Sequence, residues 1–257
     1  MDQIADDTDI WRYAALRNPI TFARAALSGE EPDEWQKEFL RSKAKRLVLS
    51  CSRQSGKSTM AAIKALHHAI FTPNHLVIIL SPSQRQSSEL FHKVSDIYHH
   101  LQLNRIEPTI QETALHIKLA NRSRVVSLPG SPNTVRGYRC DVALVDEAAL
   151  VNPDLWPAIT PSLAVSNGSL VLLSTPFGTD NYFASVCLGD DPEWTRWFIN
   201  ADQCPRISSA FLSKERKELG EWRFGEEYMN VFDTRNEAAY FDPLELEAAL
   251  DPELEPL

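Results

Sequence analysis

The chain has 257 residues, 43% of them hydrophobic and 24% charged, which is ordinary for a globular protein with one large α/β domain. Its longest purely apolar runs are about five residues, too short to span a membrane, and its acidic N-terminus lacks the apolar core of a signal peptide. The four cysteines lie far apart without a Cys-x-x-Cys pair, which favours a reducing compartment over a zinc site or a disulfide framework.

The net charge of −9 does not exclude nucleic acid, because the charge is unevenly distributed. Seven acidic residues and no basic ones follow Arg235. Without those seven, 28 of the 35 acidic residues remain against 26 basic ones, a net charge of −2. A near-neutral body with local basic patches is compatible with DNA binding.

The first part of the chain is predicted to be helical. Residues 1–34 carry apolar faces at helical spacing and are expected to form a helical lead-in. A second helix is expected to start at 32–36, where it carries a Trp-Gln pair. The amide of Gln36 offers both a donor and an acceptor, as the adenine edge requires, and packing within the helix is the alternative.

A phosphate-binding loop is predicted between a buried strand at 47–49 and a helix at 60–66, with Gly-Lys-Ser at 56–58 leading into the helix. In such a loop, backbone N–H groups wrap the phosphates, the lysine reaches the terminal ones and the serine hydroxyl holds Mg²⁺. The helix N-terminus adds partial positive charge. The usual pattern begins with a glycine where this chain has Cys51, so the alternative is an ordinary helix after a Gly-Lys turn.

Strands and helices continue to alternate along the chain. This alternation predicts a mainly parallel sheet covered by helices on both faces. The predicted elements are strands at 75–80, 142–145, 169–173 and 195–199, a helix at about 84–103, a hairpin within 113–129 that turns at 121–123, and two helices in 208–230.

Two carboxylates, Asp146 and Glu147, follow the buried strand at 142–145. Ligands of an open α/β sheet bind at the carboxyl ends of its strands, where the phosphate-binding loop also lies. Asp146 can hold Mg²⁺ through water, and Glu147 can orient and deprotonate a water for attack on the γ-phosphate of ATP. An adjacent Asp-Glu pair favours hydrolysis, and so a motor or switch, over a small-molecule kinase.

Two other segments are candidates for sensing the γ-phosphate. Arg53 lies inside the loop and can reach that phosphate or a neighbouring carboxylate, although it can also be a surface arginine. Ser174, Thr175 and Pro176 end the strand expected beside the Asp-Glu strand, where a simple strand-ending turn is the alternative.

Together these residues resemble the ATPase domain of a tailed-phage large terminase subunit, the motor that packages viral DNA. The resemblance covers roughly residues 30–235, and the Arg-Gln-x-Gly-Lys-Ser loop without its first glycine is typical of the family. It implies a RecA-like phosphate-loop fold with an additional strand. The resemblance is based on these segments: Trp35-Gln36, Ser52 to Ser58, Ser81 to Ser87, Val135-Arg136-Gly137, Asp141 to Ala149, Pro161-Ser162-Leu163 and Leu173 to Gly178.

The resemblance also implies residue roles. Ser58 and Asp146 would hold Mg²⁺, and Glu147 would be the catalytic carboxylate. Arg53 would act within its own subunit and Arg136 on the neighbouring one, with Arg139 as the rival candidate. The implied ATP-binding residues are Gln36, Ser52, Arg53, Gln54, Ser55, Gly56, Lys57, Ser58 and Thr59, and the implied coupling motif is Ser174, Thr175 and Pro176.

The function so implied is ATP hydrolysis that powers translocation of double-stranded viral DNA into a procapsid, in the cytoplasm of the bacterial host. The partners would be the DNA, the portal protein and the small terminase subunit, with a homo-oligomeric ring in the assembled motor and a monomer in isolation. One alternative is a helicase-like, nucleic-acid-stimulated ATPase, although no second phosphate-loop sheet is visible in the sequence. The other is an ATP-binding assembly module with little turnover.

The predicted organisation has three parts: the helical lead-in at 1–34, the ATPase domain at 35–235, and residues 236–257. The last part is expected to be an acidic tail or a truncated linker to a missing nuclease domain. Family members usually continue into a nuclease domain, and the residues after 235 are too few to build one. We therefore expect no nuclease activity from this chain.

Overall fold

The structure is a computed structural model that describes residues 7–105 and 107–233. Within these residues one sheet of eight strands has the order β3-β4-β5-β2-β6-β7-β1-β8. All neighbouring strands are parallel except β4, which runs antiparallel to both β3 and β5. The strands are β1 (Arg46–Cys51), β2 (Leu76–Ser81), β3 (Thr109–Thr113), β4 (His116–Leu119), β5 (Arg124–Pro129), β6 (Val142–Asp146), β7 (Ser169–Ser174) and β8 (Trp194–Ile199).

Helices precede, connect and follow these strands. None of the helices in the described residues is long and apolar enough to cross a membrane. The α-helices are α1 (Asp7–Leu16), α2 (Pro19–Ala26), α3 (Glu34–Arg41), α4 (Lys57–Phe71), α5 (Gln84–His100), α6 (Pro132–Val135), α7 (Trp156–Ala164), α8 (Tyr182–Leu188) and α9 (Ser209–Met229). The short 3₁₀ helices are η1 (Leu103–Arg105), η2 (Ala148–Leu150), η3 (Pro153–Leu155) and η4 (Ala201–Gln203).

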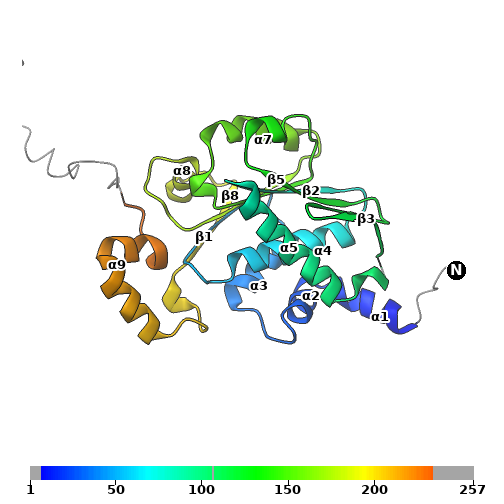
Figure 1. Cartoon of the computed structure of the whole chain (residues 1–257), viewed down its shortest axis with the longest axis horizontal. Helices are drawn as coiled ribbons and strands as arrows, with labels where there is room; N and C mark the ends of the chain where they lie inside the picture. Colours follow the sequence, from blue (N-terminus) through cyan, green and yellow to red (C-terminus); the bar gives the residue numbers. More distant parts are fainter. Residues whose placement is uncertain (1–6, 106, 234–257) are drawn as a thin grey trace, which may run out of the picture.

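The sheet lies between two layers of helices, with α1 to α5 on one face and α7 and α8 on the other (Figure 1). The central strands are apolar at nearly every position because both of their faces are buried. Successive side chains of β1 alternate between the faces: Leu47 and Leu49 pack in the core with α4, and Val48 packs in the core with α7 and α8. The prediction of a mainly parallel sheet with helices on both faces is confirmed.

The strand order determines which loops meet. β7 pairs with β6 on one side and with β1 on the other, so it separates the strand of the phosphate-binding loop from the Asp-Glu strand. Because the three strands are parallel, the segments that follow their last residues emerge at the same edge of the sheet. The predicted pairing of the 169–173 strand with the Asp-Glu strand is therefore confirmed.

Apart from the short 3₁₀ helices, four elements of the described residues were not predicted individually: the helices α6, α7 and α8 and one edge strand. The hairpin of β4 and β5 turns where expected, but the edge strand β3 was not predicted. Its sequence is mostly polar and four of its five residues are exposed, so it lacks the apolar pattern of a half-buried strand.

The C-terminal helix α9 stands beside the body of the molecule (Figure 1). A break at Gly220, with φ 76° and ψ 164°, divides it into the two predicted helices. The predicted tail at 236–257 lies outside the described residues, and the three-part division of the chain remains a prediction.

Candidate active site

The phosphate-binding loop connects β1 to α4. Gly56 precedes the first residue of α4 with φ 93°, a left-handed conformation that glycine adopts without steric cost. Cys51, where the usual pattern has glycine, is fully buried in the core beneath α4, and burial raises the pKa of its thiol to about 12. This position therefore contributes to packing in this chain.

Asp146 lies beside the first turn of α4. The Ser58 hydroxyl donates to Asp146 Oδ2 at 3.4 Å, and Asp146 is only 7% exposed. Burial and the neighbouring Glu147 raise the pKa of Asp146 to about 6. A serine hydroxyl and a carboxylate at this separation are the hard oxygen donors that Mg²⁺ prefers, so these residues fit the ion.

Glu147 is held by two neighbours. Its Oε1 lies 3.6 Å from Lys57 Nζ, and its Oε2 accepts a hydrogen bond from Ser174 Oγ at 3.4 Å. Its backbone has φ 50° and ψ 45°, a conformation that is uncommon for a residue other than glycine and that clusters at functional sites. The loop lysine, the second carboxylate and Ser174, the first residue of the predicted coupling motif, thus meet in one cluster.

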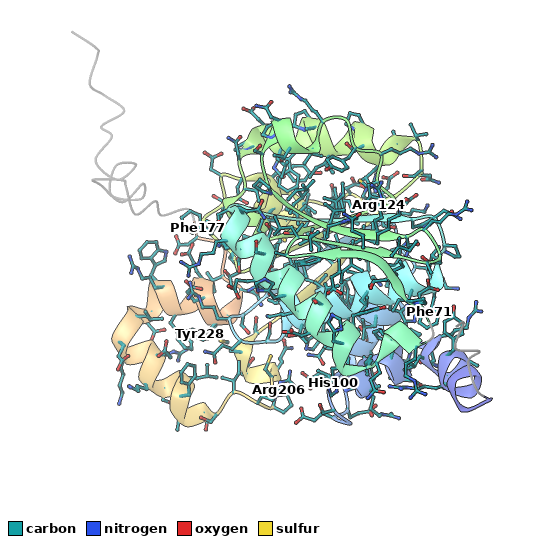
Figure 2. All side chains as sticks on the ribbon, turned by 45° about the vertical axis from the view of Figure 1, so that its right-hand side comes forward. Phe71, His100, Arg124, Phe177, Arg206 and Tyr228 are labelled. Atoms are coloured by element: carbon teal, nitrogen blue, oxygen red, sulfur yellow. The ribbon has the colours of Figure 1, made fainter. Side chains whose placement is uncertain are left out.

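A cavity of about 750 Å³ opens beside this cluster. One side is lined by residues at the carboxyl ends of the strands, Lys57, Glu147, Thr175 and Pro176. Residues of α9 line the other side. In Figure 2, Phe177 on the body and Tyr228 on α9, two further lining residues, lie on the same side of the molecule. The predicted loop, Asp-Glu and coupling segments therefore border one space large enough for a small-molecule ligand.

Arg53 lines the cavity and contacts α9. Its backbone N–H donates to Glu227 O at 2.9 Å, and its guanidinium forms an ion pair with the Glu227 carboxylate. The adjacent Glu226 accepts a hydrogen bond from the backbone N–H of Gly178, just after the coupling motif, at 2.9 Å. Two consecutive acidic residues of α9 thus contact the phosphate-binding loop and the segment that follows the predicted coupling motif.

Gln36 lies behind the loop and does not line the cavity described above. It is 2% exposed, and its Oε1 accepts from the Asp33 backbone N–H at 3.0 Å. Its Nε2 donates to the backbone carbonyl of Ser55 at 3.5 Å. Both ends of the amide therefore have protein partners, and contact with adenine remains a prediction.

The two arginines proposed for a neighbouring subunit lie apart from the cavity. Arg136 follows α6 directly, Arg139 is three residues further on, and both are exposed. Neither lines the cavity.

Several residues at the site were missed by sequence reasoning. Gln86, at the start of α5, lines the cavity and belongs to a stretch that carried the resemblance. Glu226, Glu227 and Arg206 had no local signal, because acids on a long helix and an arginine in a loop are ordinary surface residues. Their contacts depend on segments that are distant in the sequence: Glu226 and Gly178 are 48 residues apart, Arg206 and Ser55 are 151 apart, and Glu227 and Arg53 are 174 apart.

A protein-family model and two known relatives match the sequence of this chain. The model described as terminase large subunit, T4likevirus-type, N-terminal, matches residues 48–237. The large terminase subunit of Thermus phage G20c is 29% identical over 183 residues, which cover 63% of this chain and 37% of that protein. The large terminase subunit of Thermus virus P23-45 is 29% identical over 181 residues. The chain thus spans just over a third of the length of these curated relatives.

Solved structures show the same fold. The large terminase ATPase domain of Thermus phage P74-26 has a TM-score of 0.70 at 22% identity, covering 89% of this chain and 98% of that one. The large terminase of the thermophilic bacteriophage D6E in complex with ADP has a TM-score of 0.67 at 12% identity, covering 78% and 53%. The RecA-like fold and the resemblance inferred from the sequence are confirmed. The chain therefore belongs to the family of phage terminase large subunits, to whose N-terminal ATPase domain it corresponds.

Proposed function

We propose that this chain hydrolyses ATP and that the reaction drives double-stranded viral DNA into a procapsid. The observation that carries the proposal is the cluster of Lys57, Ser58, Asp146 and Glu147 at the carboxyl edge of the parallel sheet. The family supports the packaging role, and the D6E terminase solved with ADP supports a nucleotide as the ligand.

Binding of ATP follows from the loop and the first turn of α4. Backbone N–H groups of the loop contact the phosphates, and Lys57 neutralises charge on the terminal ones. Ser58 and Asp146 would hold Mg²⁺, which would supply positive charge next to the phosphate oxygens. Asp146 must be ionised for this role, and its raised pKa makes it sensitive to mild acid.

Hydrolysis is assigned to Glu147. Its carboxylate accepts a proton from the attacking water, whose oxygen bonds to the γ-phosphorus as the bond to the β–γ bridging oxygen breaks. ADP and phosphate are the products. Arg53 is a candidate to stabilise the developing charge, for which its guanidinium must leave Glu227.

Lys57 and Ser174 give the site a resting arrangement. Lys57 faces Glu147 at 3.6 Å, and a bound triphosphate competes for the same ammonium group. When Lys57 turns to the phosphates, Glu147 loses one of its two contacts and depends on Ser174 for its orientation. The coupling motif thus contacts the catalytic carboxylate through its first residue, and Thr175 and Pro176 line the cavity beyond it.

The partners belong to the proposal as well. Double-stranded DNA, the portal protein and the small terminase subunit are expected from the family, as are a ring in the assembled motor, a monomer in isolation and the host cytoplasm as location. In such a ring, each subunit would bring an exposed arginine, Arg136 or Arg139, to the ATP site of its neighbour.

Steady-state phosphate release, measured with and without duplex DNA, tests the proposed function. We expect turnover that requires Mg²⁺ and rises with duplex DNA, without strand separation. Strand separation would favour a helicase-like enzyme, and nucleotide binding without turnover would favour an assembly module. Supercoiled plasmid in the same assay should stay intact, because DNA cleavage is not part of the proposed activity.

A further inference from the structure

We propose that Arg206 is a positioning residue for the phosphate-binding loop, and that it works through the backbone carbonyl of Ser55. The inference rests on the proposed ATP site and concerns the orientation of the backbone N–H groups of the phosphate-binding loop. Arg206 lies between β8 and α9, in a segment that neither the sequence motifs nor the proposed chemistry uses. Figure 2 labels it at the edge of the molecule, where this segment leads to α9.

Arg206 connects three segments of the chain. Its two terminal nitrogens form a bidentate pair with Asp33, at 3.1 Å to Oδ1 and 2.6 Å to Oδ2. One of these nitrogens, Nη2, also donates to Ser55 O at 3.3 Å. Asp33 immediately precedes α3, and its side chain is only 13% exposed. The arginine thus joins the start of α3 to the loop.

The Ser55 carbonyl has a second donor, Gln36 Nε2, at 3.5 Å. Gln36 is itself fixed by the Asp33 backbone N–H, so both donors depend on the start of α3. The two donors also lie against Gly56: a Cβ there would come within 3.3 Å of Gln36 Nε2 and 3.9 Å of Arg206 Nη2. The side of the loop that faces these donors is therefore occupied by them.

A trans peptide is planar, and its C=O and N–H point in opposite directions. The carbonyl of Ser55 and the N–H of Gly56 belong to one such peptide. Holding Ser55 O outward, toward Arg206 and Gln36, therefore directs the Gly56 N–H inward. A phosphate-binding loop needs its N–H groups aimed at the phosphates before the ligand arrives, since otherwise binding must also order the loop.

Arginine suits this role better than lysine. Its planar guanidinium can bind a carboxylate with two nitrogens and still donate to a carbonyl, whereas an ammonium offers only a point charge with rotating donors. The Arg206 side chain is 45% exposed, so its charge is partly screened, and the effect we expect comes from geometry.

The test measures affinity for Mg-ATP and for inorganic triphosphate by calorimetry. Arg206→Ala should weaken both ligands by a similar factor, about tenfold, because the loop serves the phosphates that they share. Arg206→Lys should recover little of the loss. Arg24→Ala is the matched control, since Arg24 forms an exposed ion pair with Glu31 instead of Asp33, and it should bind both ligands as wild type does.

Asp33→Asn separates positioning from charge. Asparagine keeps a side-chain oxygen before α3 but loses the charge that orients Arg206. Positioning predicts weaker triphosphate binding by Asp33→Asn. Simple electrostatics predicts stronger binding, because a negative charge near the phosphates has been removed, and that result would overturn the proposal.

Amide hydrogen exchange of the ligand-free protein gives an independent readout. Arg206→Ala should exchange faster in residues 52–58, with the sheet strands unchanged. If amide exchange in residues 52–58 and the affinity for triphosphate are both unchanged, the proposal is also overturned. The same holds if Arg206→Ala loses affinity for ATP alone, because Arg206 would then contact the adenine base. If Arg206→Ala does not fold, Arg206→Gln replaces it. Lys57→Ala distinguishes a failure of the ATP site from a failure of the role proposed for Arg206. If the wild-type protein binds triphosphate no better than Lys57→Ala does, the proposed ATP site itself is wrong.

Discussion

Lys57 and Glu147 lie 3.6 Å apart but are assigned different steps of the proposed reaction. Lys57→Ala removes the charge that meets the terminal phosphates, a loss of about 3 kcal/mol or about a hundredfold in ATP affinity. Glu147→Ala leaves those contacts in place and should lower turnover by about 10²–10⁴-fold while ATP still binds. Calorimetry and phosphate release measure the two effects separately. Equal losses of ATP affinity in both variants would contradict this division.

Gln36 can be assigned by comparing two ligands. Because its amide contacts Ser55 O and the Asp33 N–H, we expect Gln36→Ala to weaken ATP and inorganic triphosphate to a similar degree. Contact with adenine predicts instead a loss for ATP alone. Titration of the variant with both ligands decides between these roles, and Gln36→Glu, which keeps the shape and the acceptor but loses the donor, serves as the matched variant.

At the scale of elements, α4 and β2 meet at the end of α4 remote from its loop. His68 near the end of α4 contacts His75 just before β2, with 2.8 Å between His68 Nε2 and His75 Nδ1. Burial, and then His75, lower the pKa of His68 from 6.5 to about 4. Lys64 and His67 also disfavour its charge, and Asp141 opposes them. His68 is therefore neutral in the folded protein at neutral pH.

This lowered pKa predicts a specific pH dependence of stability. Between pH 6.5 and 4 the unfolded chain binds more protons at His68 than the folded one, so stability falls as the pH falls through this window. At pH 5 the loss amounts to about 2 kcal/mol relative to pH 7.5. Urea unfolding at both pH values should show a smaller loss for His68→Gln. Equal losses in the two proteins would exclude His68 as a source of the acid sensitivity.

The sequence predicted the elements that have strong local patterns. The strand at 47–49 and the Asp-Glu strand are apolar throughout because parallel strands are buried on both faces, and this pattern is visible without neighbours. Strand β3 was not predicted, since most of its residues are exposed and, within the described residues, it pairs with β4 alone. The kink of α9 was predictable from Gly220, but the contact of its second half with Arg53 was not.

For the site, the sequence predicted which residue types would meet and missed how they are held. The motifs placed Lys57, Asp146 and Glu147 at one edge because parallel strands end together. The ion pair of Arg53 with Glu227 joins positions 174 residues apart, and a contact over that distance cannot be predicted from a local sequence pattern. The residue-specific roles remain predictions, for which the structure supplies positions.

At the scale of the whole molecule, the proposed ring predicts that hydrolysis depends on the neighbouring subunit. Arg136 is exposed and outside the cavity, so an arginine supplied by one subunit to another would complete the transition-state charge only in the assembled form. Such arginines contribute about 10³–10⁵ in rate. Phosphate release per subunit should rise with protein concentration, and Arg136→Ala should be slow at every concentration.

Mixing two inactive variants makes this test sharper. Glu147→Ala keeps Arg136 but has no working site, and Arg136→Ala keeps its site. If the arginine acts between subunits, the mixture should regain part of the lost activity. No recovery, under conditions where wild-type subunits demonstrably associate, would assign Arg136 to its own subunit and make Arg139 the next residue to mix.

The four cysteines give this protein a set of internal reporters. All are free and buried, and burial raises the pKa of the Cys51, Cys140 and Cys187 thiols to about 12 and raises that of Cys204. Because the thiolate is the reactive form, a thiol reagent modifies each one only when its surroundings open. Cys51 ends β1, Cys187 lies in α8, and the others precede β6 and follow η4. Labelling kinetics read by mass spectrometry would therefore compare local opening in four parts of the native chain, without introduced probes, with and without nucleotide.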